Sequence, residues 1–163
     1  MHVIHGIDFV PAFARGAALA IGNFDGVHRG HQALIQTAID TAHGGRALDA
    51  VCATVVMLED NPIFNAGTGA VLNFDGFCEL DACVMESGGA RAGAVSGLQR
   101  VKNPVLVARK VMEETDHVML TGDGAQRFAR VMGFPDHDPV TPERRADWFD
   151  KRNRIDEVLG EQA

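Results

Sequence analysis

Cysteine is scarce in this sequence, and the cysteines that occur form no recognisable pattern. Cys52, Cys78 and Cys83 are three in number, and their spacing matches neither a zinc site nor a redox pair. A chain of this kind is not held together by a disulfide framework. We therefore expect each cysteine to be a small, buried apolar residue in a reduced, cytoplasmic protein.

Positive charge is also in short supply, and long apolar runs are missing. The 15 Lys and Arg residues are outnumbered by 22 Asp and Glu, which leaves a formal net charge of -7. This balance argues against a nucleic-acid partner and against an anionic membrane surface. No apolar run is long enough to span a bilayer, and the first residues lack the basic-then-apolar pattern of a signal peptide.

The remaining composition is that of a soluble globular domain. The chain has 163 residues, and 46% of them are hydrophobic, so one domain with its own core is expected. Periodicity and turn residues predict an alternation of helices and strands, which favours a layered α/β fold. The expected strands cover residues 17–21, 79–85, 90–98 and 117–121, and the expected helices cover 29–42, 47–58, a segment from Pro104, 123–133 and 141–159.

Two helix starts carry specific expectations. Asn103 precedes Pro104, which is the pattern of an N-cap residue followed by proline at the first helical position. Asp123 is the expected cap of the helix that ends at Gly133. In the helix after Pro104, the buried stripe is expected to comprise Val105, Ala108, Val111 and Met112.

The most informative segment is 58–72, which is apolar yet crowded with residues that form turns. Pro62 blocks helix continuation, and Gly67 and Gly69 permit backbone angles that other residues avoid. A loop this tight turns several carbonyl groups inward, and each of them needs a partner. Either backbone amides or a hard cation can serve, so a self-satisfied turn and a cation site are both open.

Seven short stretches in order resemble the isoaspartyl peptidase/L-asparaginase family, also called plant-type asparaginases. Several short motifs in the same order and with nearly the same spacing are more specific than a single glycine motif. They extend from residue 44 to about residue 129 and occupy residues 44–51 (GGRALDAV), 58–71 (LEDNPIFNAGTGAV), 79–85 (ELDACVM), 91–95 (RAGAV), 101–104 (VKNP), 108–113 (ARKVME) and 121–125 (TGDGA).

The resemblance implies an N-terminal-nucleophile hydrolase with an αββα sandwich, of which this chain matches only the α-subunit. Members of the family cleave their own precursor immediately before a threonine, which becomes the first residue of the β-subunit. Its hydroxyl attacks the amide of asparagine or of a β-aspartyl dipeptide, and its amine acts as the base. The implied partner is therefore a β-subunit in an αβ dimer, and the implied substrate is a small amino acid or dipeptide.

The same resemblance assigns roles to residues of the 58–72 loop. It implies that Asn65 lies beside the nucleophile and orients or polarises groups there. It also implies a sodium ion, because neutral carbonyl oxygens suit a hard monovalent cation. The implied sodium ligands are the main-chain oxygens of Leu58, Glu59, Asn61, Phe64, Ala66 and Thr68, and Val111, Met112 and Glu114 lie where some members have a second cation loop.

Plainer interpretations remain open for several of these residues. An asparagine in a turn often bonds its own backbone, and this applies to Asn65. Glu79 and Asp81 are expected to be solvated strand positions rather than a catalytic carboxylate pair. His117 is expected to begin a strand without a chemical role.

The chain departs from the family pattern at two places. The expected His-Gly-Gly-Ala-Gly turn near the start is echoed only by Val-Ile-His-Gly at 3–6. A Gly-Thr cleavage site would follow a variable linker, and none occurs near the final residues 159–163. We therefore expect this chain to lack the nucleophile and to be inactive without a β-subunit.

The first 42 residues instead resemble the N-terminal part of bacterial bifunctional riboflavin kinase/FAD synthetases. Residues 28–31 form the His-x-Gly-His motif of adenylyltransferases, preceded by an expected strand and followed by an expected helix. The resemblance implies that His28 and His31, with Asn23 and Asp25, contact ATP and its Mg²⁺, because a helix N-terminus and imidazole donors stabilise phosphate charge. FMN or a similar mononucleotide would be the acceptor.

Together the two resemblances suggest a chimera with three parts. These are an adenylyltransferase-like segment at 1–43, an asparaginase-like core at 44–133, and a linker with a charged, mobile helical tail at 134–163. Three functions follow as hypotheses: the hydrolase α-subunit, which leads; an ATP-dependent adenylyltransferase module; and an inactive fragment in which the cation loop holds a scaffold together.

Overall fold

The structure is a computed structural model that describes residues 35–37, 39, 46–87 and 89–160. The chain divides into two compact units, Met1–Thr54 and Val55–Ala163. The strand predicted at 17–21 lies outside the described residues, as do the predicted nucleotide-binding residues Asn23, Asp25, His28 and His31. Residues 35–37 and 39 are helical, as expected for part of the 29–42 helix.

Helix α2 (Ala47–Asp60) begins in the first unit and ends in the second. Asp49 Oδ2 accepts a hydrogen bond from the backbone N–H of Arg46 at 2.9 Å, which satisfies an amide just before the helix. The sequence predicted this helix over 47–58, and it runs two residues further. It ends before Pro62, whose ring cannot continue a helix.

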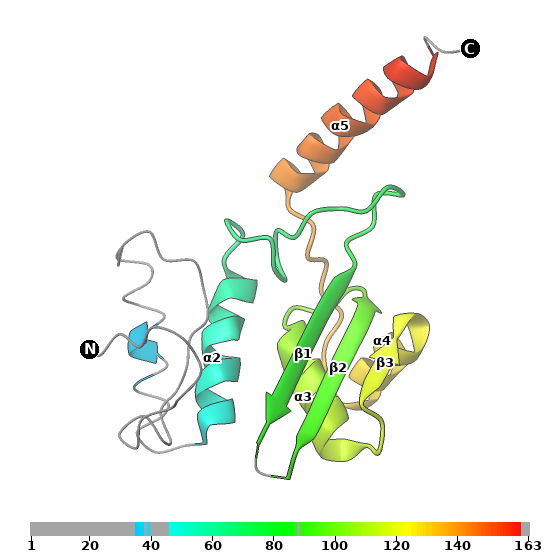
Figure 1. Cartoon of the computed structure of the whole chain (residues 1–163). Helices are drawn as coiled ribbons and strands as arrows, with labels where there is room; N and C mark the ends of the chain where they lie inside the picture. The colour runs from blue at the N-terminus through cyan, green and yellow to red at the C-terminus, as the bar shows by residue number, and fades with distance from the viewer. Residues whose placement is uncertain (1–34, 38, 40–45, 88, 161–163) are drawn as a thin grey trace, which may run out of the picture. The chain divides into compact units, whose positions relative to one another are not determined.

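The second unit is built on a three-stranded sheet (Figure 1). Strand β1 (Leu80–Glu86) pairs antiparallel with β2 (Arg91–Leu98), and β2 pairs parallel with β3 (Met119–Thr121). The expected strands at 79–85 and 90–98 are confirmed within one residue, whereas the third is shorter than the predicted 117–121. The protein is thus a mixed α/β structure, as predicted.

Helix α3 (Pro104–Glu114) packs closely on one face of this sheet. The contact requires glycine at position 93, since a Cβ there would lie 2.3 Å from Ala108 O. The predicted stripe of this helix is buried, which confirms the helical periodicity. Its buried residues are Pro104, Val105, Val107, Ala108, Val111 and Met112.

The opposite face of the sheet is open within the described part of the second unit. Cys83, Ala94 and Met119 pair across the three strands, and side chains alternate between the faces of a sheet. Their row points away from the α3 side, where Gly93 lies. Met119 is 51% exposed and Met85, which shares this face, is 78% exposed.

This open face explains why the expectation of three buried cysteines is wrong for Cys83. Cys83 is exposed because its strand position faces away from α3, whereas Cys78 is buried. Burial raises the pKa of the Cys78 thiol to about 11, so the thiolate form is suppressed at neutral pH.

Two residues that were predicted to cap helices, Asn103 and Asp123, do not form a side-chain capping bond. Asn103 occupies the N-cap position of α3, but its side chain makes no capping bond and donates instead to Asp60 Oδ1 at 2.9 Å. Helix α4 (Gly122–Val131) starts directly after β3, so Asp123 lies in its first turn rather than at the cap. Thr121 holds the N-cap position, also without a side-chain bond.

The end of α4 follows the expected glycine pattern, although the helix stops two residues before Gly133. Gly133 has φ +86°, its N–H donates to Arg130 O, and the N–H of Phe134 donates to Ala129 O. This pair of bonds is a Schellman motif, which closes a helix on a left-handed glycine.

Helix α5 (Pro142–Gly160) is attached near its start to the turn that precedes β1. Trp148 Nε1 donates to Asn73 O at 2.8 Å, and the indole lies close to Gly76. Arg152 stacks over the Phe74 ring at 4.1 Å. The expected helix at 141–159 is thus confirmed, while the division of the chain at residues 43 and 133 stays a prediction. Among the described residues, none of the helices has the length and apolar character needed to cross a membrane.

Candidate functional site

The 58–72 loop, which begins with the last turn of α2, is wound by bonds to its own backbone. Thr68 N–H donates to Glu59 O at 2.8 Å, Asn61 N–H to Leu58 O at 3.3 Å, and Phe64 N–H to Asn61 O at 3.1 Å. Gly67 has φ +54°, and a Cβ there would lie 2.5 Å from Glu59 O. The expectation that glycine is required in this loop is therefore confirmed.

These bonds bear on the six main-chain oxygens expected to bind sodium. Three of them, those of Leu58, Glu59 and Asn61, already accept backbone hydrogen bonds. A carbonyl oxygen has two lone pairs, so one bond does not exclude a cation. Within the described residues, no backbone N–H is bonded to the oxygens of Phe64, Ala66 or Thr68. The loop thus combines a partly self-satisfied turn with three oxygens that suit a hard cation.

Asn65 is fixed by a bond to the backbone, as the plainer interpretation proposed. Its Oδ1 accepts from the N–H of Val71 at 2.8 Å. One lone pair of this oxygen is thus engaged, and the NH₂ group is a donor that could act on a ligand. Asn65 is therefore suited to stabilise an oxygen atom, and not to remove a proton.

Asn65 lies on the wall of a cavity of about 280 Å³. The cavity joins the 58–72 loop to the start of β1, and its acidic members are already hydrogen-bonded. Asp81 accepts from Gly97 N–H at 2.8 Å, and Glu79 accepts from Asn73 Nδ2 at 2.8 Å. The structure therefore gives Glu79 and Asp81 exposed hydrogen bonds to different partners. The lining residues are Glu59, Asn65, Ala66, Gly67, Ala70, Val71, Glu79, Leu80, Asp81 and Pro104.

The side chain of Glu59 is the feature of this site that sequence reasoning missed. It is only 3% exposed, and its Oε1 accepts the N–H of Val105 in the first turn of α3 at 3.0 Å. Within the part of the chain that the structure describes, Oε2 has no hydrogen-bond partner. Burial raises the pKa of Glu59 to about 7, against the opposing effects of the Val105 hydrogen bond and of the nearby Asn103 side chain.

No local pattern could have revealed this contact, because the two ends are 46 residues apart. A neighbouring carboxyl group is in the opposite state. Burial alone would raise the pKa of Asp60, but hydrogen bonds from Asn103 and Lys102 hold that pKa below its usual value. The junction of α2 and α3 thus contains one buried and one exposed carboxyl group with different proton affinities.

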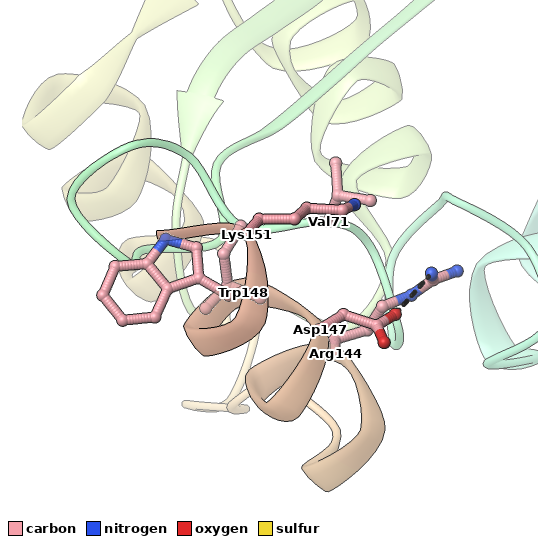
Figure 2. Close-up of a pocket in the computed structure, with 6 residues that line it drawn as sticks. Val71, Arg144, Asp147, Trp148 and Lys151 are labelled. Carbon is pink, nitrogen blue, oxygen red and sulfur yellow. Dashed lines mark ion pairs between the residues drawn. The ribbon is translucent and has the colours of Figure 1, made fainter. Parts of the chain in front are cut away.

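A second, much smaller pocket lies where α5 meets the loop. Figure 2 shows Arg144, Asp147, Trp148 and Lys151 of α5 beside Val71. Arg144 forms an ion pair with Asp147 at 3.7 Å. The pocket has a volume of about 30 Å³, which is room for about one water molecule and not for a substrate.

The residues of the suggested second cation loop belong to a helix, and their binding of a cation stays a prediction. Val111, Met112 and Glu114 lie in the last turns of α3, where Val111 and Met112 pack into the core and Glu114 pairs with Lys110. His117 was expected to begin a strand, but it lies two residues before β3; it is exposed, and its backbone N–H donates to Thr115 Oγ1. The described residues contain no group of three or more His, Cys, Asp or Glu that could hold a metal ion.

Comparison with known proteins identifies related sequences. The family model described as asparaginase matches residues 18–161. A plant-type L-asparaginase of Pyrococcus abyssi is 58% identical over 111 residues, which are 68% of this chain and 36% of that protein. Isoaspartyl peptidase/L-asparaginases are 53% identical over 93 residues in Danio rerio (57% of this chain, 30% of that protein) and 47% identical over 116 residues in Homo sapiens (69% and 38%).

Two consequences follow from these matches. The chain spans about a third of the length of these relatives. The family match also begins at residue 18, within the segment that resembles riboflavin kinase/FAD synthetases, and the matches do not support a chimera.

Proposed function

Since the chain belongs to the asparaginase family, we propose that it is the α-subunit part of an amidohydrolase that acts on asparagine or β-aspartyl peptides. The observation that carries this proposal is the state of Asn65. Its amide oxygen accepts from Val71 N–H, and the residue lines the cavity, where its NH₂ group could serve as a donor. A fixed donor beside a cavity is the arrangement that amide hydrolysis uses to stabilise a reacting oxygen.

The nucleophile in this proposal comes from a β-subunit that begins with threonine. Its hydroxyl attacks the amide carbonyl, and its own amine takes the proton and passes it to the ammonia or amine that leaves. Water then hydrolyses the resulting ester, which releases aspartate and restores the threonine. Asn65 would donate to an oxygen of the nucleophile or of the substrate. Asn65 is neutral, so this contribution does not depend on its protonation.

The open face of the sheet supports a second layer of structure from the partner. In the row of Cys83, Ala94 and Met119, with Met85, the side chains on β1 and β3 are exposed and Ala94 on β2 is half-buried. An apolar sheet face is stabilised when a second sheet packs against it. We infer that the β-subunit supplies this layer and completes the αββα sandwich of N-terminal-nucleophile hydrolases.

Sodium is proposed as the structural ion of the 58–72 loop. The oxygens of Phe64, Ala66 and Thr68 are neutral, hard donors of the kind that alkali and alkaline-earth cations take. In this position the ion would hold the loop in shape and would not take part in proton transfer.

Co-expression with a β-subunit that begins with threonine tests the function. The purified αβ assembly is expected to release aspartate from asparagine or from a β-aspartyl dipeptide, and the chain alone is expected to release none. A β-subunit that begins with alanine is the matched control. A well-assembled complex without hydrolysis would leave the inactive-scaffold hypothesis as the better account.

A further inference from the structure

Three hydrogen bonds connect the 58–72 loop to the segment before α5 and to the first turn of α5. Thr68 Oγ1 lies 3.0 Å from His137 Nε2, and Gly69 N–H donates to Pro139 O at 2.8 Å. Arg144 Nε donates to Gly69 O at 2.6 Å. All three meet two consecutive loop residues, although their partners lie about 70 positions further along the chain.

This segment is itself anchored away from the loop. The Arg130 guanidinium donates to Arg100 O at 2.7 Å and to Pro135 O at 3.0 Å, and it pairs with Asp136 at 2.9 Å. The N–H of His137 also donates to Arg100 O at 3.1 Å. Residues 134–137 are therefore held near the end of β2 by bonds that do not involve the loop.

The bonds to Gly69 bear directly on the orientation of Asn65. Both the N–H and the carbonyl of Gly69 are held from outside the loop, and its φ of +88° is a conformation that only glycine adopts readily. Two residues further on, Val71 N–H binds Asn65 Oδ1. Rotation of the backbone at Gly69 would therefore move the amide to which Asn65 is bonded.

We propose that His137 and Arg144 are positioning residues that hold the 58–72 loop and, through it, the Val71 amide to which Asn65 is bonded at the wall of its cavity. Their role in catalysis rests on the proposed function, but their role in holding the loop does not. The contact between Thr68 and His137 survives a change of imidazole tautomer, because a hydroxyl group can donate or accept. Arg144 is additionally steadied by Asp147 (Figure 2).

Amide hydrogen exchange on the whole chain, followed residue by residue, tests this role. Thr68→Val removes the hydroxyl at nearly constant volume and leaves the main-chain oxygen in place, while Thr68→Ser keeps the hydroxyl. His137→Leu removes the ring nitrogen, while His137→Gln keeps a polar atom near the Nε2 position. The reference amide is that of Gly97, which donates to Asp81 Oδ1 in the sheet.

We expect Thr68→Val and His137→Leu each to speed exchange at Gly69 and Val71 about 5-fold, the loss corresponding to one hydrogen bond. Exchange at Gly97 is expected to stay unchanged, and Thr68→Ser and His137→Gln should exchange nearly as the parent does. The double variant should be no faster than either single variant, because both remove the same contact. Equal acceleration at all three amides, or no acceleration at Val71, would overturn the proposal.

The same variants in the αβ assembly provide the functional readout. A positioning role predicts a lower kcat with an unchanged KM, and recovery in Thr68→Ser and His137→Gln. An unchanged kcat in Thr68→Val, measured in an assembly whose parent is active, would refute the link to Asn65. An inactive parent assembly would instead count against the proposed hydrolase. The exchange measurement would still decide whether the contact between His137 and Thr68 holds the loop.

Discussion

Replacing Glu59 by glutamine should change how the stability of this chain depends on pH. Burial raises the pKa of Glu59 from an ordinary 4.5 to about 7, so the folded state holds this proton more tightly than the unfolded state does. Stability is therefore highest below the unfolded pKa and falls as the pH rises through the folded one. Above pH 7 the folded chain retains a buried carboxylate, whose Oε2 has no partner among the described residues.

The size of the effect follows from the two pKa values. Each tenfold difference in proton affinity is worth about 1.4 kcal/mol, so the whole shift corresponds to about 3 kcal/mol. Most of that, about 2 kcal/mol or slightly more, should be lost between pH 5 and pH 8. Glu59→Gln keeps an oxygen for Val105 N–H but carries no charge, so it should lack this loss and be the more stable protein at pH 8.

Urea unfolding at pH 5, 6, 7 and 8 measures this difference, with the fluorescence of Trp148 as one probe and circular dichroism as another. Glu114→Gln is the matched control, since Glu114 pairs with Lys110 on the exposed side of α3. The series should be run in choline chloride and in sodium chloride, because a cation in the loop would lower the pKa of Glu59 and flatten the curve. Parallel pH profiles for the parent and Glu59→Gln in choline would refute the reasoning.

Three further predictions follow. Gly93→Ala should destabilise the chain by at least about 2 kcal/mol in urea unfolding, because the new Cβ would lie 2.3 Å from Ala108 O; a smaller loss would show that α3 can shift. Asn65→Asp keeps the oxygen that binds Val71 N–H but removes the NH₂ group. It should leave the melting temperature of the chain within about 2 °C and lower kcat of the αβ assembly at least about 10-fold, and full activity would exclude a donor role. Exchange of sodium for choline should lower the melting temperature of the chain by an amount that grows with the logarithm of sodium concentration, and indifference to the cation would refute a sodium site in the 58–72 loop.

The parts of the fold that depend on local patterns could be predicted from the sequence. The alternation in 79–85 and the turn before it marked β1, and the apolar spacing after Pro104 marked the face of α3 that packs on the sheet. Gly67 and Gly69 indicated positive φ, which both adopt. In these segments the residues that set the conformation lie within a few positions of one another, so a single sequence is sufficient.

The site could be predicted only in outline, because its polar groups choose partners that are distant in the chain. Asn103 has the right identity and position for a cap, yet Asp60 offers its side chain a charged acceptor, and a hydrogen bond to a charged group is stronger than one to a neutral amide. The first turn of α3 is then left with an open donor at Val105, which the buried carboxylate of Glu59 accepts. One exchange of partners thus accounts both for the wrong cap and for the missed glutamate.

Polar contacts between distant parts of the chain also concern residues 134–140. Their composition predicted a linker, and the structure shows them bonded to the rest of the second unit. Their prolines and aspartates are typical of an exposed connection, and nothing local indicates that Pro139 is fully buried. Arg130 holds the start of the segment, and the backbone N–H of Gly69, which is distant in the chain, donates to Pro139. Local periodicity does not reveal this second contact. If this account is right, the shape of the 58–72 loop depends as much on the residues before α5 as on its own glycines. A substitution at His137 should then loosen Asn65, although His137 is outside the cavity that Asn65 lines.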